Sequence, residues 1–219
     1  MSIDLSHWTP PPFPERQTLE GRWCRLEPLS VERHGTVLWK HLAGHDGLWE
    51  FLFQAPSQSE AEYRALLQGM ESRADIIPLA MIDKADGEAK GHLWIMEIRP
   101  AHGVFEVGSI TWSPAMQRTR IATEAIFLVG DYGFSLGYRR YEWKCNNRNE
   151  PSKRAAERFG FTYEGLFRQH MVIKGKNRDT AWYSITDGEW PQRKARFEAW
   201  LGPGNFDAEG RQLKALDAS

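Results

Sequence analysis

Cysteine is scarce in this chain of 219 residues, which contains only Cys24 and Cys145, each within an apolar stretch that alternates like a strand. Small secreted domains that depend on disulfides carry a much higher density of cysteine. We therefore expect two buried free thiols, rather than a disulfide or a reactive nucleophile.

Long hydrophobic runs and an excess of one charge are also lacking. No apolar run is long enough to cross a bilayer, and residues 1–17 have neither the basic nor the apolar part of a secretion signal. Lysine and arginine number 28 against 29 aspartates and glutamates, so no basic field exists to attract nucleic acid. We expect a cytoplasmic protein that binds neither membranes nor nucleic acid.

Motifs of several common enzyme classes are missing as well. There is no Gly-x-Ser-x-Gly elbow, Walker loop or Gly-x-Gly-x-x-Gly, which removes the commonest hydrolase, NTPase and dehydrogenase interpretations. His41 and His45 have the spacing of a metal pair, but Gly44 interrupts the helix and no third ligand is placed nearby. We expect a pair of histidines at a helix end and no metal.

The length suits one ordinary domain with an extension at each end. Residues 1–21 are rich in proline, which cannot continue a helix or a central strand, so we expect an extended arm on the surface. Residues 22–201 form the predicted domain. Residues 202–219 are rich in glycine and charge, and we expect a flexible tail.

Hydrophobic periodicity predicts an α+β fold within that domain. Strands are expected at 23–27, 76–82, 91–98, 105–112, 141–145, 161–173 and 178–185, and helices at 31–42, from Ser59 to near Met70, 121–136, 151–160 and 191–201. The turn 84–87 predicts an antiparallel hairpin. The strand, helix, strand order predicts parallel pairing of 106–112 with 140–145, within a mixed, mostly antiparallel sheet flanked by helices.

A polar turn, residues 115–120, leads into the helix at 121–136. Successive N–H groups at a helix N-terminus form a ready site for a pyrophosphate. Arg118 and Arg120 place two long cationic side chains in that turn, where they either clamp phosphate or mark a turn that has lost its ligand. We favour the clamp, because a positive charge at a helix N-terminus opposes the helix dipole unless an anion is bound.

Three segments resemble the GNAT superfamily of N-acetyltransferases, and in particular its branch of ribosomal-protein alanine acetyltransferases (RimJ/RimL-like), across about residues 22–190. They are the strand 106–112, the turn and helix start 117–125, and the helix 149–161, which begins Asn-x-x-Ser and ends Gly-Phe. The resemblance implies the GNAT fold, with a central pair of splayed parallel strands and acetyl-CoA as co-substrate. Arg120 departs from the family pattern, which has glycine there.

The resemblance also implies the site residues. Those expected to bind the cofactor are Ile110, Thr111, Trp112, Gln117, Arg118, Thr119, Arg120, Ile121, Ala122, Thr123, Asn149 and Ser152. In many family members a tyrosine protonates the CoA sulfur, but Ala156 stands at that position. Ser152 is then the predicted acid or hydrogen-bond donor, or only a residue of the helix start. Asn149 either bonds the pantetheine arm or is a turn residue.

Glu106 is the candidate base, since acyl transfer requires a neutral amine; it could also be a solvated carboxylate at a strand end. The expected acceptor wall is aromatic: Trp39, Trp49, Phe51, Phe53 and Trp94. The sequence thus predicts an acetyltransferase in which a protein N-terminus or a small primary amine attacks acetyl-CoA directly, in a ternary complex. A CoA-binding module without turnover, a larger donor such as succinyl-CoA, and a homodimer all stay open.

Overall fold

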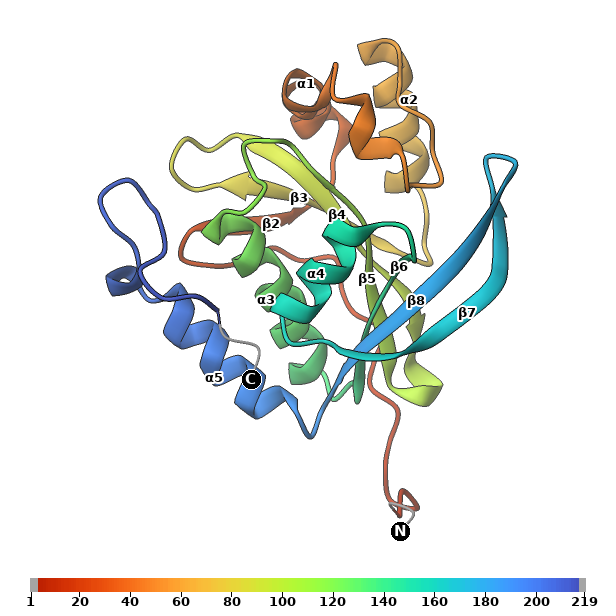
Figure 1. Ribbon diagram of the computed structural model, residues 1–219, viewed down its shortest axis with the longest axis vertical. Coiled ribbons are helices and arrows are strands. Elements are labelled where there is room, and N and C mark those ends of the chain that lie inside the picture. Colours follow the sequence, from red (N-terminus) through yellow and green to blue (C-terminus); the bar gives the residue numbers. More distant parts are fainter. Residues whose placement is uncertain (1–3, 217–219) are drawn as a thin grey trace.

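The computed structural model describes residues 4–216, which fold around one sheet of eight strands. The strand order is β1-β2-β3-β4-β5-β6-β8-β7 (Figure 1). The strands are β1 Leu19–Glu20, β2 Cys24–Pro28, β3 Ile77–Asp83, β4 Ala89–Arg99, β5 Val104–Trp112, β6 Arg140–Asn146, β7 Thr162–Ile173 and β8 Lys176–Thr186. Only β5 and β6 pair in parallel, so the predicted α+β class with a mostly antiparallel sheet is confirmed.

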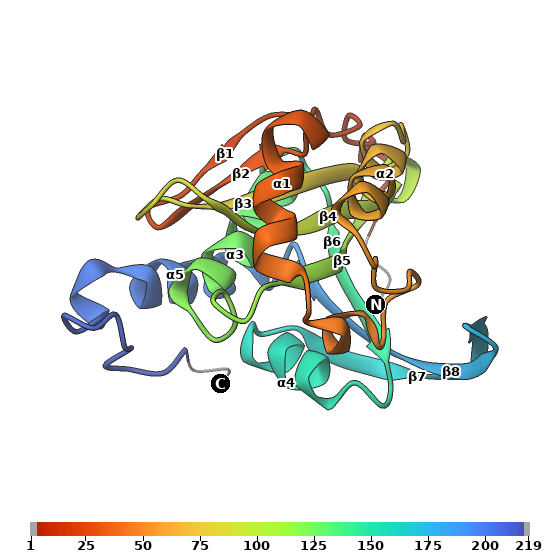
Figure 2. The same cartoon turned by 90° about the horizontal axis from the view of Figure 1, so that it is seen from above.

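Helices cover both faces of this sheet. They are α1 Val31–Leu42, α2 Glu60–Glu71, α3 Arg120–Ser135, α4 Glu150–Arg158 and α5 Trp190–Leu201, with short 3-10 turns at Asp46–Trp49, Pro100–His102 and Pro203–Asn205. Helices α1 and α2 lie together on one face, while α3, α4 and α5 lie on the other (Figure 2). Each helix falls where the periodicity predicts it, within one or two residues.

Each face of the sheet carries its own core, because side chains alternate along a strand. In β3, Leu79 and Met81 enter the core beneath α3, α4 and α5, while Ala80 and Ile82 enter the core beneath α1 and α2. Cys24 and Cys145 are free and buried, as predicted. Within residues 4–216 no helix combines the length and the apolar character needed to span a membrane.

The parallel pair is shorter than the sequence predicts. Pairing runs from Val104 opposite Arg140 to Glu106 opposite Glu142 and stops there, rather than extending over 106–112. Beyond this point β6 continues beside β8 to Asn146, and β5 continues beside β4 to Trp112. The two central strands therefore splay apart, and the edge of β5 that faces β6 has no strand partner from Val107 onward.

The described part of the N-terminal segment, from residue 4, contacts the domain through hydrogen bonds to two tyrosines. The Tyr138 hydroxyl donates to the carbonyl of Pro12 at 3.2 Å, and the backbone N–H of Glu15 donates to the Tyr132 hydroxyl at 2.8 Å. Strand β1 then pairs antiparallel with β2, so the arm ends as the edge strand of the sheet.

The C-terminal segment differs from the predicted flexible tail over its described part, residues 202–216. The Phe206 ring packs edge-on against Trp200 at 5.1 Å and Trp23 at 5.7 Å, and Leu216 is buried in the core beneath α3, α4 and α5. Removing these apolar side chains from water holds the segment against the domain despite its polar composition. Residues 217–219 of the predicted tail lie outside the described residues.

Candidate active site

A cleft of about 1200 Å³ opens where β5 and β6 splay apart. Its walls come from β5, the starts of α3 and α4, the turn and loop at 47–53, and the C-terminal residues 209–212. All twelve residues predicted to bind the cofactor line this one cleft, although the chain brings them from three separate segments.

The turn before α3 has the geometry of an anion site. The Thr119 hydroxyl caps the helix by accepting from the N–H of Ala122 at 3.4 Å. The N–H groups of Arg120 and Ile121, in the first turn, have no acceptor among residues 4–216. Arg118 has φ of 61°, a left-handed conformation that favours glycine and that holds the turn in its tight shape. The free N–H groups at the start of α3 can receive a pyrophosphate.

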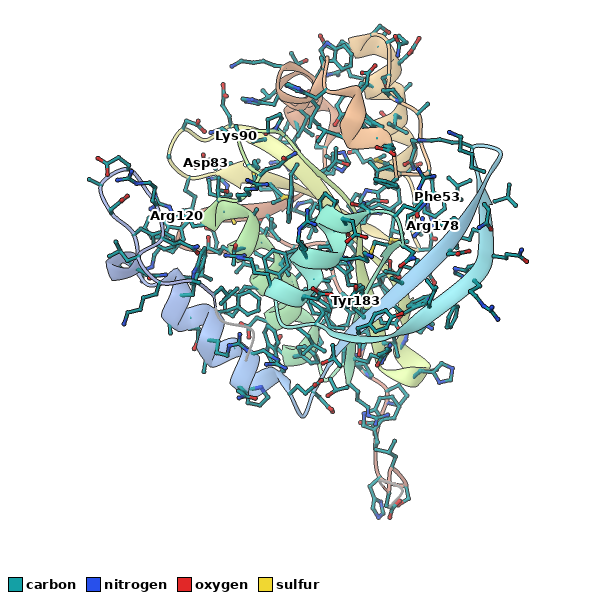
Figure 3. All side chains as sticks on the ribbon, viewed as in Figure 1. Phe53, Asp83, Lys90, Arg120, Arg178 and Tyr183 are labelled. Carbon is teal, nitrogen blue, oxygen red and sulfur yellow. The ribbon has the colours of Figure 1, made fainter. Side chains whose placement is uncertain are left out.

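Arg120 lines the cleft and is held by aromatic stacking. Its guanidinium carbon lies 3.7 Å from the centroid of the Trp23 ring and 5.2 Å from that of Phe206. Figure 3 shows Arg120 where the start of α3 meets the C-terminal segment. Stacking uses the face of the guanidinium and leaves its edge donors available, and no described residue forms an ion pair with it.

Arg158 is a second cation at this end that the sequence interpretation missed. Its Nη1 donates to the Thr123 hydroxyl at 3.0 Å, and the guanidinium lies 4.9 Å from the centroid of the Trp200 ring. Burial lowers its pKa from the ordinary arginine value. The sequence could have indicated this residue, because Pro151, Ala155 and Arg158 are spaced to share one face of the helix, and all three line the cleft.

Glu106 is not a solvated carboxylate at a strand end. Its side chain is 2% exposed, and Oε2 accepts a hydrogen bond from Nζ of Lys144 at 2.7 Å. Burial raises the pKa of Glu106 to about 7, and the opposing attraction of Lys144 limits the rise. Lys144 was missed because only the pairing register of β5 with β6 brings it to Glu106.

Ser152 lies in the first turn of α4 and faces the cleft. Asn149 is the cap of this helix, since its Oδ1 accepts from the N–H of Ser152 at 3.1 Å. The Trp143 indole N–H donates to the Ser152 hydroxyl oxygen at 3.1 Å. An indole only donates, so the hydroxyl proton of Ser152 points to another acceptor, and the Cys145 sulfur is the neighbour that it meets in this structure. Ala156, at the family's tyrosine position, is fully buried, and no tyrosine of the described chain lines the cleft.

The aromatic residues predicted for the acceptor wall divide into two groups. Phe51 and Phe53 line the cleft. Trp39, Trp49 and Trp94 do not line it: Trp49 and Trp94 are buried in the core beneath α1 and α2, and Trp39 packs against that core. The correction has a simple cause, because two helices on this face need large side chains to fill the layer between them and the sheet.

The histidine pair lies away from the cleft. His41 lies at the end of α1, where its Nε2 is 2.7 Å from Oε2 of Glu88. Among residues 4–216 no group of three histidine, cysteine or carboxylate side chains is arranged to hold a metal ion.

Comparison with known proteins assigns the class. Residues 24–162 match the acetyltransferase (GNAT) domain family, and this chain belongs to that family, whose enzymes use acetyl-CoA as co-substrate. Its crystal structure relatives include a GCN5-related N-acetyltransferase from Brucella melitensis, 50% identical with a TM-score of 0.94 over 97% of each chain. A probable acetyltransferase from Chromobacterium violaceum is 39% identical with a TM-score of 0.82, over 87% of this chain and 96% of that one.

Other relatives are also named as N-acetyltransferases. The spermidine N(1)-acetyltransferase of Escherichia coli is 26% identical over 156 residues, 71% of this chain and 81% of that protein. The uncharacterised N-acetyltransferase YoaA of Bacillus subtilis is 41% identical over 73 residues, which are 33% of this chain and 41% of YoaA. The chain thus spans less than half the length of YoaA.

Proposed function

We propose that this protein transfers the acetyl group of acetyl-CoA to a primary amine that enters the cleft from the side opposite the pyrophosphate turn. One observation carries the proposal: the cleft between the splayed strands joins a helix start with free N–H groups to a buried carboxylate whose pKa is raised to about 7. The acetyl group, between the two, would meet the amine beside Glu106.

Backbone N–H groups and positive charges at the α3 end of the cleft support the binding of CoA in this proposal. The free N–H groups of Arg120 and Ile121 suit the pyrophosphate, and the guanidinium groups of Arg120 and Arg158 add positive charge beside it. The unpaired edge of β5, from Val107 onward, offers backbone groups to the pantetheine amides, as an added strand would.

Glu106 supplies the base in this proposal. Its carboxylate takes a proton from the ammonium form of the acceptor, and the neutral nitrogen then attacks the thioester carbonyl. The C–N bond forms and the negative charge moves to the carbonyl oxygen, which backbone N–H groups of β5 stabilise. The C–S bond then breaks, and the hydroxyl of Ser152 donates its proton to the departing sulfur. The new nitrogen loses its extra proton, which returns to the Ser152 oxygen through solvent, and the products are the neutral amide and free CoA.

A test of turnover separates this proposal from a CoA-binding module. Acetyl-CoA is mixed with the protein and a panel of amines that includes peptides with free N-termini, and the released thiol is measured. The Glu106→Gln variant is the control for background hydrolysis. Calorimetry with CoA in the presence of EDTA measures binding separately. Binding without thiol release for any amine would show a CoA-binding module and contradict the proposal.

A further inference from the structure

Arg178 is a buried cation in the cleft that forms no ion pair with any residue from 4 to 216. The residue is 5% exposed and lines the cleft wall. Nε donates to the Thr180 hydroxyl at 3.3 Å, and the two terminal nitrogens have no acceptor among the same residues. Burial lowers the pKa of this guanidinium from its ordinary value, and the attraction of nearby Glu106 only partly opposes that effect.

The position of Arg178 follows from the register of β8. Thr180 pairs with Asn146, and Trp182 pairs with Lys144, so alternate residues of β8 share a face with Lys144. Lys144 contacts both the Trp182 ring, at 5.3 Å, and the carboxylate of Glu106. Arg178 therefore lies on the face of the sheet that carries the candidate base, opposite the face covered by α3 and α4.

Neighbouring charges offset the charge of Arg178 only in part. The carboxylate of Glu106 attracts the guanidinium, but its hydrogen bond goes to Lys144, and no described residue forms an ion pair with Arg178. Glu50, which also lines the cleft, is exposed and makes no ion pair with any described residue. The guanidinium also lies against the ring of Phe53, with 5.3 Å between its carbon and the ring centroid, and Figure 3 shows these two side chains side by side between the 47–53 loop and β8.

We propose that Arg178 receives a carboxylate of the acceptor, so that the acceptor is a small amine that also carries a carboxylate, with its apolar part against Phe53. The inference rests on the function proposed above. A planar guanidinium with two free nitrogens matches a carboxylate in bidentate geometry, and burial strengthens the interaction. The same charge opposes a polycationic acceptor, which distinguishes this cleft from one built for a polyamine.

The test compares standard L-amino acids, each with its own carboxamide, as acceptors for acetyl-CoA. Wild type should favour the acid over the amide by about tenfold to a hundredfold in kcat/KM, the range expected for a hydrogen bond to a charged group. Arg178→Met should abolish the preference, mainly through the KM of the acid, while the amide changes little. Arg178→Lys keeps the positive charge but loses the bidentate geometry of the guanidinium, so it should retain part of the preference for the acid. Arg168→Met, at an exposed position of β7, is the matched control and should keep the wild-type preference.

Three results would overturn the inference. The first is equal use of acids and amides by wild type, and the second is no binding or acetylation of any pair. The third is a wild-type preference for succinyl-CoA over acetyl-CoA that Arg178→Met removes, since the carboxylate would then belong to the donor. Calorimetry of the amino acids on the complex with CoA needs no turnover. If amino acids bind in a way that depends on Arg178 but are not acetylated, the result would contradict the proposed reaction and support the carboxylate site.

Discussion

The ammonium of Lys144 on β6 and the carboxylate of Glu106 on β5 form an ion pair of 2.7 Å across the point where the two strands separate, with side chains 7% and 2% exposed. The last rung of the parallel ladder joins Glu106 to Glu142, so Lys144 reaches back from two residues further along β6. Burial raises the pKa of Glu106 to about 7, and the charge of Lys144 opposes a larger rise. A pKa close to the working pH is the most useful one for a base at neutral pH.

We predict that kcat/KM of the wild-type enzyme rises with pH through about 7, because Glu106 must lose its proton to accept one from the acceptor. Glu106→Gln should lower kcat/KM at pH 7 by about a hundredfold or more, and part of the rate should return as pH approaches the pKa of the amine. A steady-state pH profile measures both effects. Glu97→Gln is the control, since Glu97 is about half exposed and 3.7 Å from Lys144. The charge of Glu97 helps to raise the pKa of Glu106, so this variant should keep an inflection, moved to slightly lower pH. An unchanged inflection in Glu106→Gln would contradict the assignment.

Ser152→Ala should lower kcat and kcat/KM together, by about tenfold to ten-thousandfold, with little change in CoA affinity. The physical reason is that the hydroxyl proton is used mainly in the transition state, when the sulfur becomes negative. Ser113→Ala is the matched control, because the Ser113 hydroxyl is buried without a partner and does not line the cleft. Full kcat in Ser152→Ala with a lower melting temperature would assign Ser152 to the structure of the helix start alone.

Arg120→Glu should weaken CoA binding by about 1 to 3 kcal/mol, since an attraction to phosphate becomes a repulsion. Isothermal titration calorimetry with CoA measures the change, and the difference should shrink at high salt. Arg22→Glu makes the same change of charge at an exposed position outside the cleft and serves as the control. If both variants bind CoA like the wild type, Arg120 serves only to hold Trp23 and Phe206 together.

Trp49→Ala should destabilise the protein by about 3 to 5 kcal/mol, because it leaves a large cavity beneath α1 and α2, where Trp49 is 3% exposed. Phe53→Ala should instead raise the KM of the acceptor with little effect on stability, since Phe53 lines the cleft and is 43% exposed. Denaturant unfolding and steady-state kinetics on both variants separate the two roles. If Trp49→Ala is as stable as the wild type and has a raised KM for the acceptor, Trp49 would belong to the acceptor wall after all.

The sequence alone determined the helices and strands, and it predicted the residues at the α3 and α4 end of the cleft. Apolar residues repeat with periods near 2 in strands and 3.6 in helices, and these repeats are local, so α1 and the β3–β4 hairpin follow from a few adjacent residues. The phosphate turn is also local, because a helix start brings its own free N–H groups with it. For the same reason the twelve residues predicted to bind the cofactor come from three short segments, and all of them line the cleft.

Only the tertiary structure decided which side chains meet at the acceptor end. The pairing register of β6 with β5 brings Lys144 to Glu106, and the register of β6 with β8 brings Arg178 to the same cleft. Both registers join residues that are far apart in the chain. The sequence pattern does not separate a tryptophan in a core from one in a pocket wall, since both positions favour a large apolar ring. Trp49 and Phe53 stand four residues apart in one loop, and packing against α2 buried the first and left the second in the cleft.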